Sequence, residues 1–234
     1  MLRGKNAIIT GARSGIGFAT LQQFAQKGVN CWAVVRRDDD KFGEQIQLLQ
    51  EQNNVWIKQV HIDLSESESI KTGFKEIIKE KLPIDILVNA AGIVSPDRLF
   101  SMTKMLDIRK VMDVNFFSIL ETIQLVYRVM LRQRSGSIIN IASIAADCED
   151  ISQLEYAVSK AALVCATKKL AREMGAVGIR VNAVSPGFTD TKMTQEIEDE
   201  TMSKINSGLT LKRLARPEEI AKTITFLASD DSCF

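Results

Sequence analysis

Short β-branched apolar runs alternate along the chain with stretches whose apolar residues recur every three or four positions. This alternation is typical of parallel β-α-β units. The short runs predict strands at Asn6–Thr10, Asn30–Val35, Val55–His61, Ile84–Asn89, Ser137–Ala142 and Arg180–Ser185. The other stretches predict helices at Ile16–Lys27, Lys41–Gln52, Ser67–Lys81, Leu106–Arg132 (as two helices), Leu154–Ala176, Thr191–Ser207 and Pro217–Ser229. Strands joined by right-handed helical crossovers predict an α/β fold, with a doubly wound parallel sheet and helices on both faces.

Length and composition narrow the class of protein. The 234 residues, 45% hydrophobic and 25% charged, fit one soluble globular domain spanning residues 1–234. Thirty basic and 29 acidic residues give a net charge of +1. The protein as a whole therefore has no electrostatic attraction for nucleic acid. The uncharged run Ser135–Ala146 is too short to span a bilayer, and Met1–Lys5 leads directly into a predicted strand without a signal segment. We therefore expect a cytoplasmic protein that binds neither nucleic acid nor membrane.

Cysteine and histidine usage argues against a metal centre. Cys31, Cys148, Cys165 and Cys233 share no metal-ligand spacing, and His61 is the only histidine. Zinc sites need several such ligands at characteristic spacings. We expect no metal, thiols without a chemical role in a reducing compartment, and a structural role for the histidine.

A glycine-rich turn joins the first predicted strand to the first predicted helix. Gly11 permits a tight turn, Gly15 allows backbone amides to approach a pyrophosphate, and Gly17 allows close helix–strand packing. Glycines at this spacing also occur in purely structural turns. The candidate phosphate-binding residues of this turn are Gly11, Arg13, Ser14, Gly15, Ile16 and Gly17.

Four further residues have the chemistry and spacing of a catalytic site. Tyr156 and Lys160 are four residues apart, so a helix brings them to one face. Ser143 follows the end of a predicted buried strand, the edge at which such sheets bind ligands. Asn115 lies in an apolar helical stretch, where a buried amide requires a partner. A tyrosine–lysine pair of this spacing is common on exposed helices, so it is informative only together with the serine and the asparagine.

These motifs resemble those of the classical short-chain dehydrogenase/reductases, over the whole chain from the first strand. The matching residues are Thr10–Gly17, Asn89–Gly92, Asn115, Ser143, Tyr156–Lys160 and Pro186–Gly187. The resemblance implies a Rossmann fold that binds one nicotinamide dinucleotide at the carboxyl ends of the strands. It also implies cofactor contacts from Asp63, Leu64, Asn89, Ala90, Gly92, Tyr156, Lys160, Pro186, Gly187, Thr189 and Thr191.

The charge after the second strand favours NADP(H) as the cofactor. Where an NAD-preferring enzyme has an acid for the ribose 2′-hydroxyl, this chain has Val35, followed by Arg36 and Arg37. Arg13 in the glycine loop faces the same space, and guanidinium groups suit phosphate geometry. The alternative is that these are surface arginines without a ligand.

The resemblance also implies roles in reducing a ketone. Tyr156 would donate the proton to the carbonyl oxygen, with its pKa lowered by Lys160 and by the oxidised nicotinamide. Ser143 would hydrogen-bond that oxygen as negative charge grows on it, and Gln153 would complete the substrate contacts. Lys160 would also hold the nicotinamide ribose, and Asn115 would anchor a water that relays protons to bulk solvent.

Within the family, the chain is similar to 3-oxoacyl-[acyl-carrier-protein] reductases. The shared stretches include Asn89–Ile93, Leu170–Met174 and Leu214–Ala228. This implies NADPH-dependent reduction of a 3-oxoacyl thioester in fatty-acid-type synthesis, with an acyl carrier protein as partner. Those reductases bind the acidic carrier protein through basic residues near the entrance of the active site. Arg134 matches one of these positions, whereas Val177 does not match the other.

Other functions remain open at this stage. The acidic loop at 147–150 would repel an acidic carrier or a phosphorylated substrate. One alternative is therefore another ketone or alcohol, such as a sugar of surface-glycan synthesis. A second alternative is a non-catalytic dinucleotide-binding sensor.

The end of the chain departs from the family pattern. Family members continue after the last helix into a seventh strand, whereas this sequence stops at Phe234, so either the sequence is a fragment or the protein lacks that strand. Helices around Asn115–Arg132 and Leu154–Ala176 could form the family's dimer contact, and we expect a homodimer or homotetramer. The Thr191–Ser207 segment is expected to close over the substrate.

Overall fold

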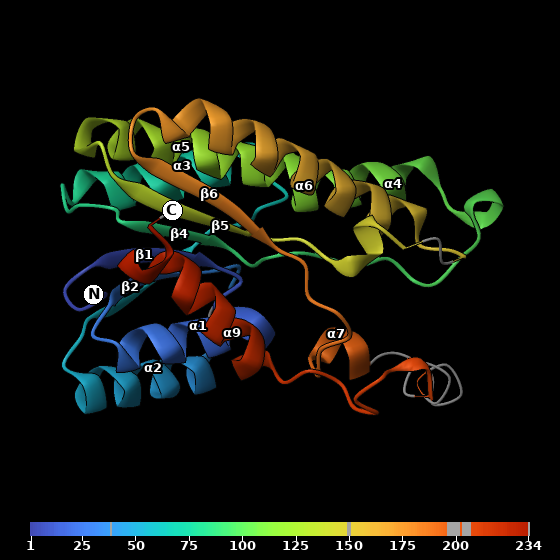
Figure 1. Ribbon diagram of the computed structural model, residues 1–234, viewed down its shortest axis with the longest axis horizontal. Helices are drawn as coiled ribbons and strands as arrows, with labels where there is room; N and C mark the ends of the chain where they lie inside the picture. The colour runs from blue at the N-terminus through green and yellow to red at the C-terminus, as the bar shows by residue number, and fades with distance from the viewer. Residues whose placement is uncertain (38, 149–150, 196–201, 203–206, 234) are drawn as a thin grey trace.

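Six parallel strands form one sheet in the order β3-β2-β1-β4-β5-β6, which confirms the predicted doubly wound α/β fold (Figure 1). The computed structural model describes residues 1–37, 39–148, 151–195, 202 and 207–233. The strands are β1 (Asn6–Thr10), β2 (Asn30–Val35), β3 (Ile57–His61), β4 (Ile86–Asn89), β5 (Gly136–Ile141) and β6 (Ile179–Val184). No strand follows β6 within the described ranges.

Helices cover both faces of this sheet (Figure 1). On one face lie α1 (Gly15–Gln26), α2 (Asp40–Asn53) and α9 (Pro217–Ala228). On the other side lie α3 (Ser67–Lys79), α4 (Met105–Met112), α5 (Ser118–Gln133) and α6 (Leu154–Gly175). Short elements complete the chain: η1 (Phe100–Met102), η2 (Asp113–Phe117), η3 (Ile144–Ala146), α7 (Lys192–Gln195) and η4 (Asp230–Ser232). The predicted helix at Thr191–Ser207 is thus helical over α7, and most of its remainder lies outside the described residues.

Each face of the sheet has its own hydrophobic core. Along β1, Ile9 packs into the core shared with α1, α2 and α9, while Ile8 packs into the core shared with α3, α5 and α6. Because both faces of the sheet are covered, neighbouring residues of a central strand such as Ile8 and Ile9 are both apolar and buried, instead of alternating with exposed polar residues. Each large apolar side chain that is fully buried in this way stabilises the fold by about 1.5–3 kcal/mol.

The predicted pair of helices at Leu106–Arg132 is one continuous helical segment with an irregular turn in its middle. A single π-helical turn, η2, joins α4 to α5. Such turns widen the backbone spiral by one residue and often occur at functional sites. Here the turn carries Asn115, whose side chain is completely buried.

By length and composition, the segment Met105–Gln133 could also cross a membrane. The core helix of a soluble protein passes the same test, and 44% of the most apolar window is buried inside the fold. Ile123, Val126 and Met130 of this segment belong to the second hydrophobic core. The expectation that the protein does not enter a membrane stays a prediction.

A buried chain of amides and hydroxyls fixes α5 and α6 to the centre of the sheet. Asn89 Nδ2 donates to Asn140 Oδ1 (2.9 Å), and Asn140 Nδ2 donates to Thr167 Oγ1 (2.9 Å). Thr122 Oγ1 donates to Asn89 Oδ1 (3.1 Å). Every member of this chain has a partner in a low-dielectric interior, so the two helices are held in register with β4 and β5.

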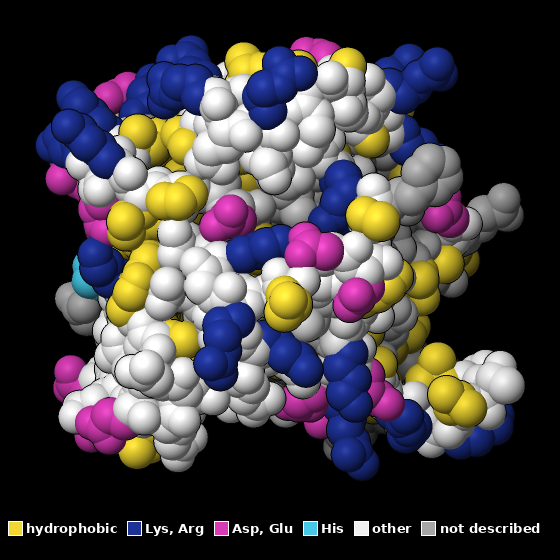
Figure 2. All heavy atoms as spheres, turned by 60° about the vertical axis from the view of Figure 1, so that its left-hand side comes forward, with side chains coloured by type: hydrophobic (Ala, Val, Ile, Leu, Met, Phe, Trp, Pro, Cys, Tyr) yellow, Lys and Arg dark blue, Asp and Glu magenta, His cyan; other side chains and the backbone are white. Residues whose placement is uncertain are grey.

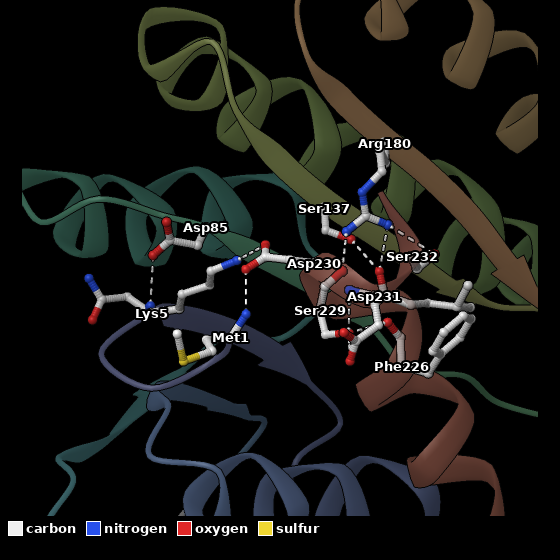
Figure 3. Close-up of polar contacts among 12 residues, drawn as sticks. Met1, Lys5, Asp85, Ser137, Arg180, Phe226, Ser229, Asp230, Asp231 and Ser232 are labelled. Carbon is white, nitrogen blue, oxygen red and sulfur yellow. Dashed lines mark hydrogen bonds and ion pairs between the residues drawn. The ribbon is translucent and has the colours of Figure 1, made fainter. Parts of the chain in front are cut away.

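The two ends of the chain meet beside β6 (Figure 3). Arg180 donates to the carbonyl oxygens of Leu227 (2.7 Å) and Ser229 (3.1 Å), at the end of α9. Asp230 accepts from Lys5 Nζ (2.6 Å) and from the amino group of Met1. On the face seen in Figure 2, basic and acidic side chains are interspersed rather than segregated by sign.

Candidate active site

The turn between β1 and α1 has a backbone that only glycine fits at two positions. Gly11 has φ +66°, and an added Cβ there would lie 2.9 Å from the Ala91 backbone. An added Cβ at Gly17 would lie 2.2 Å from the Gly11 carbonyl oxygen. These contacts bring the turn against the chain that leaves β4, which is the tight packing expected of the motif.

This turn fits the phosphates of a dinucleotide. The first turn of α1 presents backbone N–H groups that have no intrahelical acceptor, and the N-cap residue Ser14 makes no side-chain capping bond. Gly15, with φ +53°, is the first residue of α1, and its lack of a side chain lets a phosphate come close to the backbone. Ile16 is partly buried against the first core. A helix N-terminus of this kind favours bound anions.

Thr10 was named above only as the first residue of the glycine motif, and the structure gives its side chain a role. Its Oγ1 accepts hydrogen bonds from the backbone N–H groups of Ala90 (3.1 Å) and Ala91 (3.2 Å). The side chain of Asn89 is engaged in the sheet network, so only its backbone is left to contact a cofactor. The last residue of β1 therefore fixes the start of the loop after β4. A small polar residue ending a strand was the only available signal.

The arginines predicted to bind a 2′-phosphate surround the end of β2. Arg36 and Arg37 are exposed beyond the buried Val35. Arg13 forms an ion pair with Asp39 (3.4 Å), and the Asp39 carboxylate also caps α2 by accepting from the Phe42 backbone N–H. This partner of Arg13 lies 26 positions away in the chain, so the structure rather than the sequence pattern reveals it.

Asp63 lies two residues after the end of β3 and faces the same region as Arg36. The pKa of Asp63 is lowered, first by hydrogen bonds from the Ser65 hydroxyl and backbone N–H, and less by the positive charge of Arg36. Leu64 packs against the second core. Two candidate cofactor residues from neighbouring strands, Arg36 and Asp63, are thus brought together.

The loop after β6 returns to the glycine turn. The Ile144 N–H donates to the Pro186 carbonyl oxygen (3.1 Å), which joins this loop to η3. Thr189 is buried, and its hydroxyl donates to the Gly187 carbonyl oxygen (2.9 Å). The side chain of Thr191 lies 3.2 Å from where a Cβ on Gly15 would be. The loop expected to hold the nicotinamide therefore reaches from the catalytic region to the phosphate loop.

The serine, tyrosine and lysine come together at the carboxyl ends of β4 and β5. Ser143 caps η3, where its Oγ accepts from the Ala145 N–H (3.2 Å), and its hydroxyl also hydrogen-bonds Tyr156. The ammonium of Lys160 lies 5.7 Å from the centre of the Tyr156 ring and donates to the Ile141 carbonyl oxygen (2.8 Å). The helix α6 supplies both the tyrosine and the lysine from one face, as the spacing predicted.

Protonation in this cluster differs from the expectation for the tyrosine. Burial raises the pKa of Tyr156, and the hydrogen bond from Ser143 opposes this only in part. Burial also lowers the pKa of Lys160 to about 8. The lowering of the Tyr156 pKa expected from Lys160 is therefore not seen in the protein alone, because loss of solvation raises this pKa more than the hydrogen bond from Ser143 lowers it.

The side-chain amide of the buried Asn115 is hydrogen-bonded within the protein. Its Oδ1 accepts from the Ile93 N–H (2.8 Å), and its Nδ2 donates to the Ile93 carbonyl oxygen (2.8 Å) and to Ser159 Oγ (3.2 Å). The amide is thereby fully occupied in holding the loop after β4. Any water in a proton relay would bind elsewhere on this residue, such as its backbone, and the relay stays a prediction.

Comparison with known proteins assigns the family. The family model described as enoyl-(acyl carrier protein) reductase matches residues 11–234. The 3-oxoacyl-[acyl-carrier-protein] reductase FabG of Chlamydia trachomatis is 35% identical over 236 residues, covering 100% of this chain and 94% of that protein. A solved short chain dehydrogenase/reductase family protein is 32% identical, with TM-score 0.86 over 100% of this chain and 93% of its own. The chain belongs to the short-chain dehydrogenase/reductase family.

Two more relatives extend this picture. FabG of Thermotoga maritima is also 35% identical, over 100% of this chain and 94% of its own. A solved putative NAD(P) dependent gluconate 5-dehydrogenase from Beutenbergia cavernae, with bound NADP, is 30% identical with TM-score 0.92, covering 99% of this chain and 92% of its own. This short-chain dehydrogenase/reductase is therefore an oxidoreductase of a family that binds a nicotinamide dinucleotide.

The remaining predicted residues of this short-chain dehydrogenase/reductase lie as follows. Gln153, the expected substrate contact, is the N-cap of α6 in a left-handed conformation (φ 49°), directly after Ser152 at φ 83°. Strained backbone of this kind clusters at functional sites.

Of the acidic loop, positions 149 and 150 lie outside the described residues. No group of three or more potential metal ligands occurs among the described residues.

One positional expectation is wrong. Arg134 was expected near the site entrance, but it ends α5 just before the amino end of β5. Ser143 lies beyond the opposite end of that strand, and six strand residues span roughly 20 Å. Val177, the non-matching position, is partly buried against the second core. Within one chain, Arg134 does not line the catalytic site.

Proposed function

We propose that this oxidoreductase uses NADPH to reduce the 3-oxo group of a 3-oxoacyl thioester to a secondary alcohol, as a step of fatty-acid-type synthesis. The observation that carries the proposal is the hydrogen-bonded pair of Ser143 and Tyr156 beside the buried ammonium of Lys160. The names of the curated relatives, 3-oxoacyl-[acyl-carrier-protein] reductases, support the thioester as substrate.

The chemistry divides between the cofactor and the protein. When bound, the reduced nicotinamide would supply the hydride that adds to the carbonyl carbon. Tyr156 would donate its hydroxyl proton to the carbonyl oxygen, while Ser143 would hydrogen-bond the same oxygen as negative charge develops there. Because burial raises the pKa of Tyr156, the phenol keeps its proton at neutral pH, as reduction requires. The positive charge of Lys160 would stabilise the phenolate that remains.

NADP(H) is proposed over NAD(H) because of the charge around β2. Arg13, Arg36 and Arg37 surround a strand end at which Val35 stands where an acid would select NAD. The carboxylate of Asp39 is engaged with Arg13 and with the start of α2, which reduces its repulsion of a 2′-phosphate. The NADP bound to the solved relative supports the same choice.

We further propose an acyl carrier protein as the carrier of the substrate, a cytoplasmic location, and a homodimer or homotetramer. Exposed apolar side chains on the helices expected at the dimer contact support self-association, since burying them would remove apolar surface from water. These side chains are Phe117, Leu131, Leu154 and Val158.

A second candidate substrate is a sugar or another small ketone. It is favoured by the structural likeness to a putative gluconate 5-dehydrogenase. The acidic side chain of Asp147, exposed four residues after Ser143, would also tolerate a neutral polyol better than an acidic carrier.

The test is NADPH oxidation by the purified full-length protein with acetoacetyl-CoA, beside the Tyr156→Phe variant and with NADH in parallel. We expect turnover that is faster with NADPH and falls by at least about 100-fold in Tyr156→Phe, because the proton donor is lost. The variant should bind NADPH within a few-fold of wild type.

Other results would redirect the proposal. Turnover of 5-ketogluconate but not of acetoacetyl-CoA would support the sugar ketone. NADPH binding without turnover of either ketone would indicate the non-catalytic sensor. Tighter binding of NADH than of NADPH at physiological salt would overturn the cofactor choice.

A further inference from the structure

Next to the catalytic tyrosine lies a buried carboxylate that the proposed chemistry does not use. Glu155 is in the first turn of α6, and only 2% of its surface is exposed. Its Oε1 accepts a hydrogen bond from the Ser95 hydroxyl. Its Oε2 is buried and has no hydrogen-bond partner among the described residues. A buried oxygen without a partner costs free energy, so its presence calls for a physical reason.

The carboxylate belongs to a buried stripe on α6. Glu155, Ser159 and Leu163 recur at four-residue intervals and are all buried. Ser159 Oγ donates to the Tyr156 carbonyl oxygen (2.7 Å) and accepts from Asn115 Nδ2 (3.2 Å). This face of α6 therefore contacts the loop after β4 in two ways. Ser159 contacts it indirectly, through Asn115, and Glu155 contacts it directly.

The loop between β4 and η1, residues 90–99, is therefore attached at three successive points. Thr10 holds its beginning, at the N–H groups of residues 90 and 91. Asn115 holds its middle, at the backbone of Ile93. Glu155 holds Ser95. Between the first two points, Gly92 passes Lys160 closely, since a Cβ there would lie 3.5 Å from Nζ.

These attachments divide the loop by function. The first two act on the part that contains the candidate cofactor residues Asn89, Ala90 and Gly92. Beyond Ser95, the chain continues through exposed residues into η1, and Leu99 and Phe100 expose apolar side chains there. Beyond Ser95, the ion pair that the structure describes for this loop is the exposed one between Arg98 and Asp107 (4.0 Å), so the buried bond to Glu155 is the stronger restraint where the loop leaves the catalytic lysine.

We propose that Glu155 is a positioning residue for the carbonyl substrate: through Ser95, it fixes the outer end of the 90–99 loop beside Tyr156. The negative charge is tolerated there because it lies in the first turn of α6, where the helix dipole favours an anion. The proposal rests on the proposed reductase function. The bond of Glu155 to Ser95 needs only an acceptor, so an amide in place of the carboxylate should serve.

The first test separates substrate from cofactor effects. In Glu155→Leu, we expect the KM for acetoacetyl-CoA to rise about tenfold, the size expected for losing a hydrogen bond to a charged group. The kcat should change less than about threefold, and the dissociation constant of NADPH less than about twofold, because Thr10 and Asn115 still hold the cofactor end of the loop. Leucine fills the volume of the buried side chain without an unpaired oxygen, so the variant should fold.

Matched variants isolate the bond itself. Glu155→Gln keeps an acceptor for the Ser95 hydroxyl and should match wild type within about twofold. Ser95→Ala should reproduce Glu155→Leu, and the double variant should be no worse than either single one, since both remove the same contact. Glu173→Leu removes an exposed carboxylate from the same helix and serves as the control for charge.

A second measurement does not depend on turnover. Hydrogen exchange of a peptide covering residues 92–102 should be faster in Glu155→Leu than in wild type, and unchanged in Glu155→Gln and Glu173→Leu. Unchanged exchange in Glu155→Leu, or a KM for the carbonyl within twofold of wild type, overturns the proposal. If the wild-type protein reduces no ketone, the proposed function fails, and the exchange result alone decides whether Glu155 holds the loop.

Discussion

Lys160 is a charged side chain kept almost entirely out of water. Only 4% of it is exposed, and its ammonium donates to one carbonyl oxygen, that of Ile141. Burial therefore lowers its pKa from 10.5 to about 8. Below pH 8 the folded protein holds a buried charge, which costs stability but provides the positive charge expected to act on Tyr156.

The cost of this buried charge should be measurable as a pH-dependent stability. Between pH 8 and 10.5 the unfolded chain binds the proton of Lys160 more tightly than the folded chain, so stability rises with pH. Relative to Lys160→Met, the wild-type protein should gain about 3 kcal/mol of unfolding free energy over that interval. Urea unfolding of both proteins at several pH values checks this. A difference that stays constant from pH 7 to 10.5 would contradict the buried, depressed lysine.

At the scale of elements, two helices use glycine in opposite ways. In α1, Gly17 lies against the backbone of the glycine turn, with no room for a Cβ. In α2, Gly43 has open surroundings, because the nearest atom to an added Cβ is a side-chain nitrogen of Gln59 at 3.8 Å. Both residues are interior to helices, where glycine is entropically unfavourable. Only the first therefore has a structural reason to be glycine.

Alanine at these two positions should act with opposite sign. Gly17→Ala should destabilise the protein by at least about 2 kcal/mol and abolish NADPH binding, because a backbone contact of 2.2 Å must be relieved in the phosphate loop. Gly43→Ala should stabilise it by about 0.5–1 kcal/mol without changing NADPH affinity. Thermal unfolding and cofactor titration measure both effects. Equal effects of the two substitutions would show that the turn yields more easily than its geometry indicates.

At the scale of the whole molecule, Arg180 joins the end of α9 to the edge of the sheet (Figure 3). Its guanidinium lies partly buried and donates to the backbone carbonyls of Leu227 and Ser229, as well as to Ser232 Oγ (3.4 Å). The neighbouring Asp230, paired with Lys5, is largely exposed. Charge-assisted bonds to buried carbonyls contribute more than an exposed ion pair, because water screens the latter.

Removing these two groups should separate their contributions. Arg180→Leu should cost about 2–3 kcal/mol and expose residues 227–233 to proteolysis, since carbonyl oxygens lose their donors. Asp230→Asn should cost less than about 1 kcal/mol, and that effect should disappear at 1 M salt. Urea unfolding at two salt concentrations, with limited proteolysis, is the measurement. A larger loss in Asp230→Asn than in Arg180→Leu would contradict this ranking.

The sequence by itself determined the elements and the family. Strands such as Asn6–Thr10 and Asn30–Val35 occur where they were predicted, because apolar periodicity is a local property of neighbouring residues. The four-residue spacing of Tyr156 and Lys160 likewise sufficed to place them on one helix face.

Only the tertiary structure decided which distant residues of those elements contact one another, and how burial shifts the pKa of the site residues. Asn115 meets Ile93 across 22 positions, Arg13 meets Asp39 across 26, and Ser95 meets Glu155 across 60. Helix and strand periodicity does not extend over such separations, so these contacts follow from packing rather than from pattern. The direction of the Tyr156 pKa shift was decided in the same way, because burial, which no motif encodes, raises this pKa more than the Ser143 hydrogen bond lowers it.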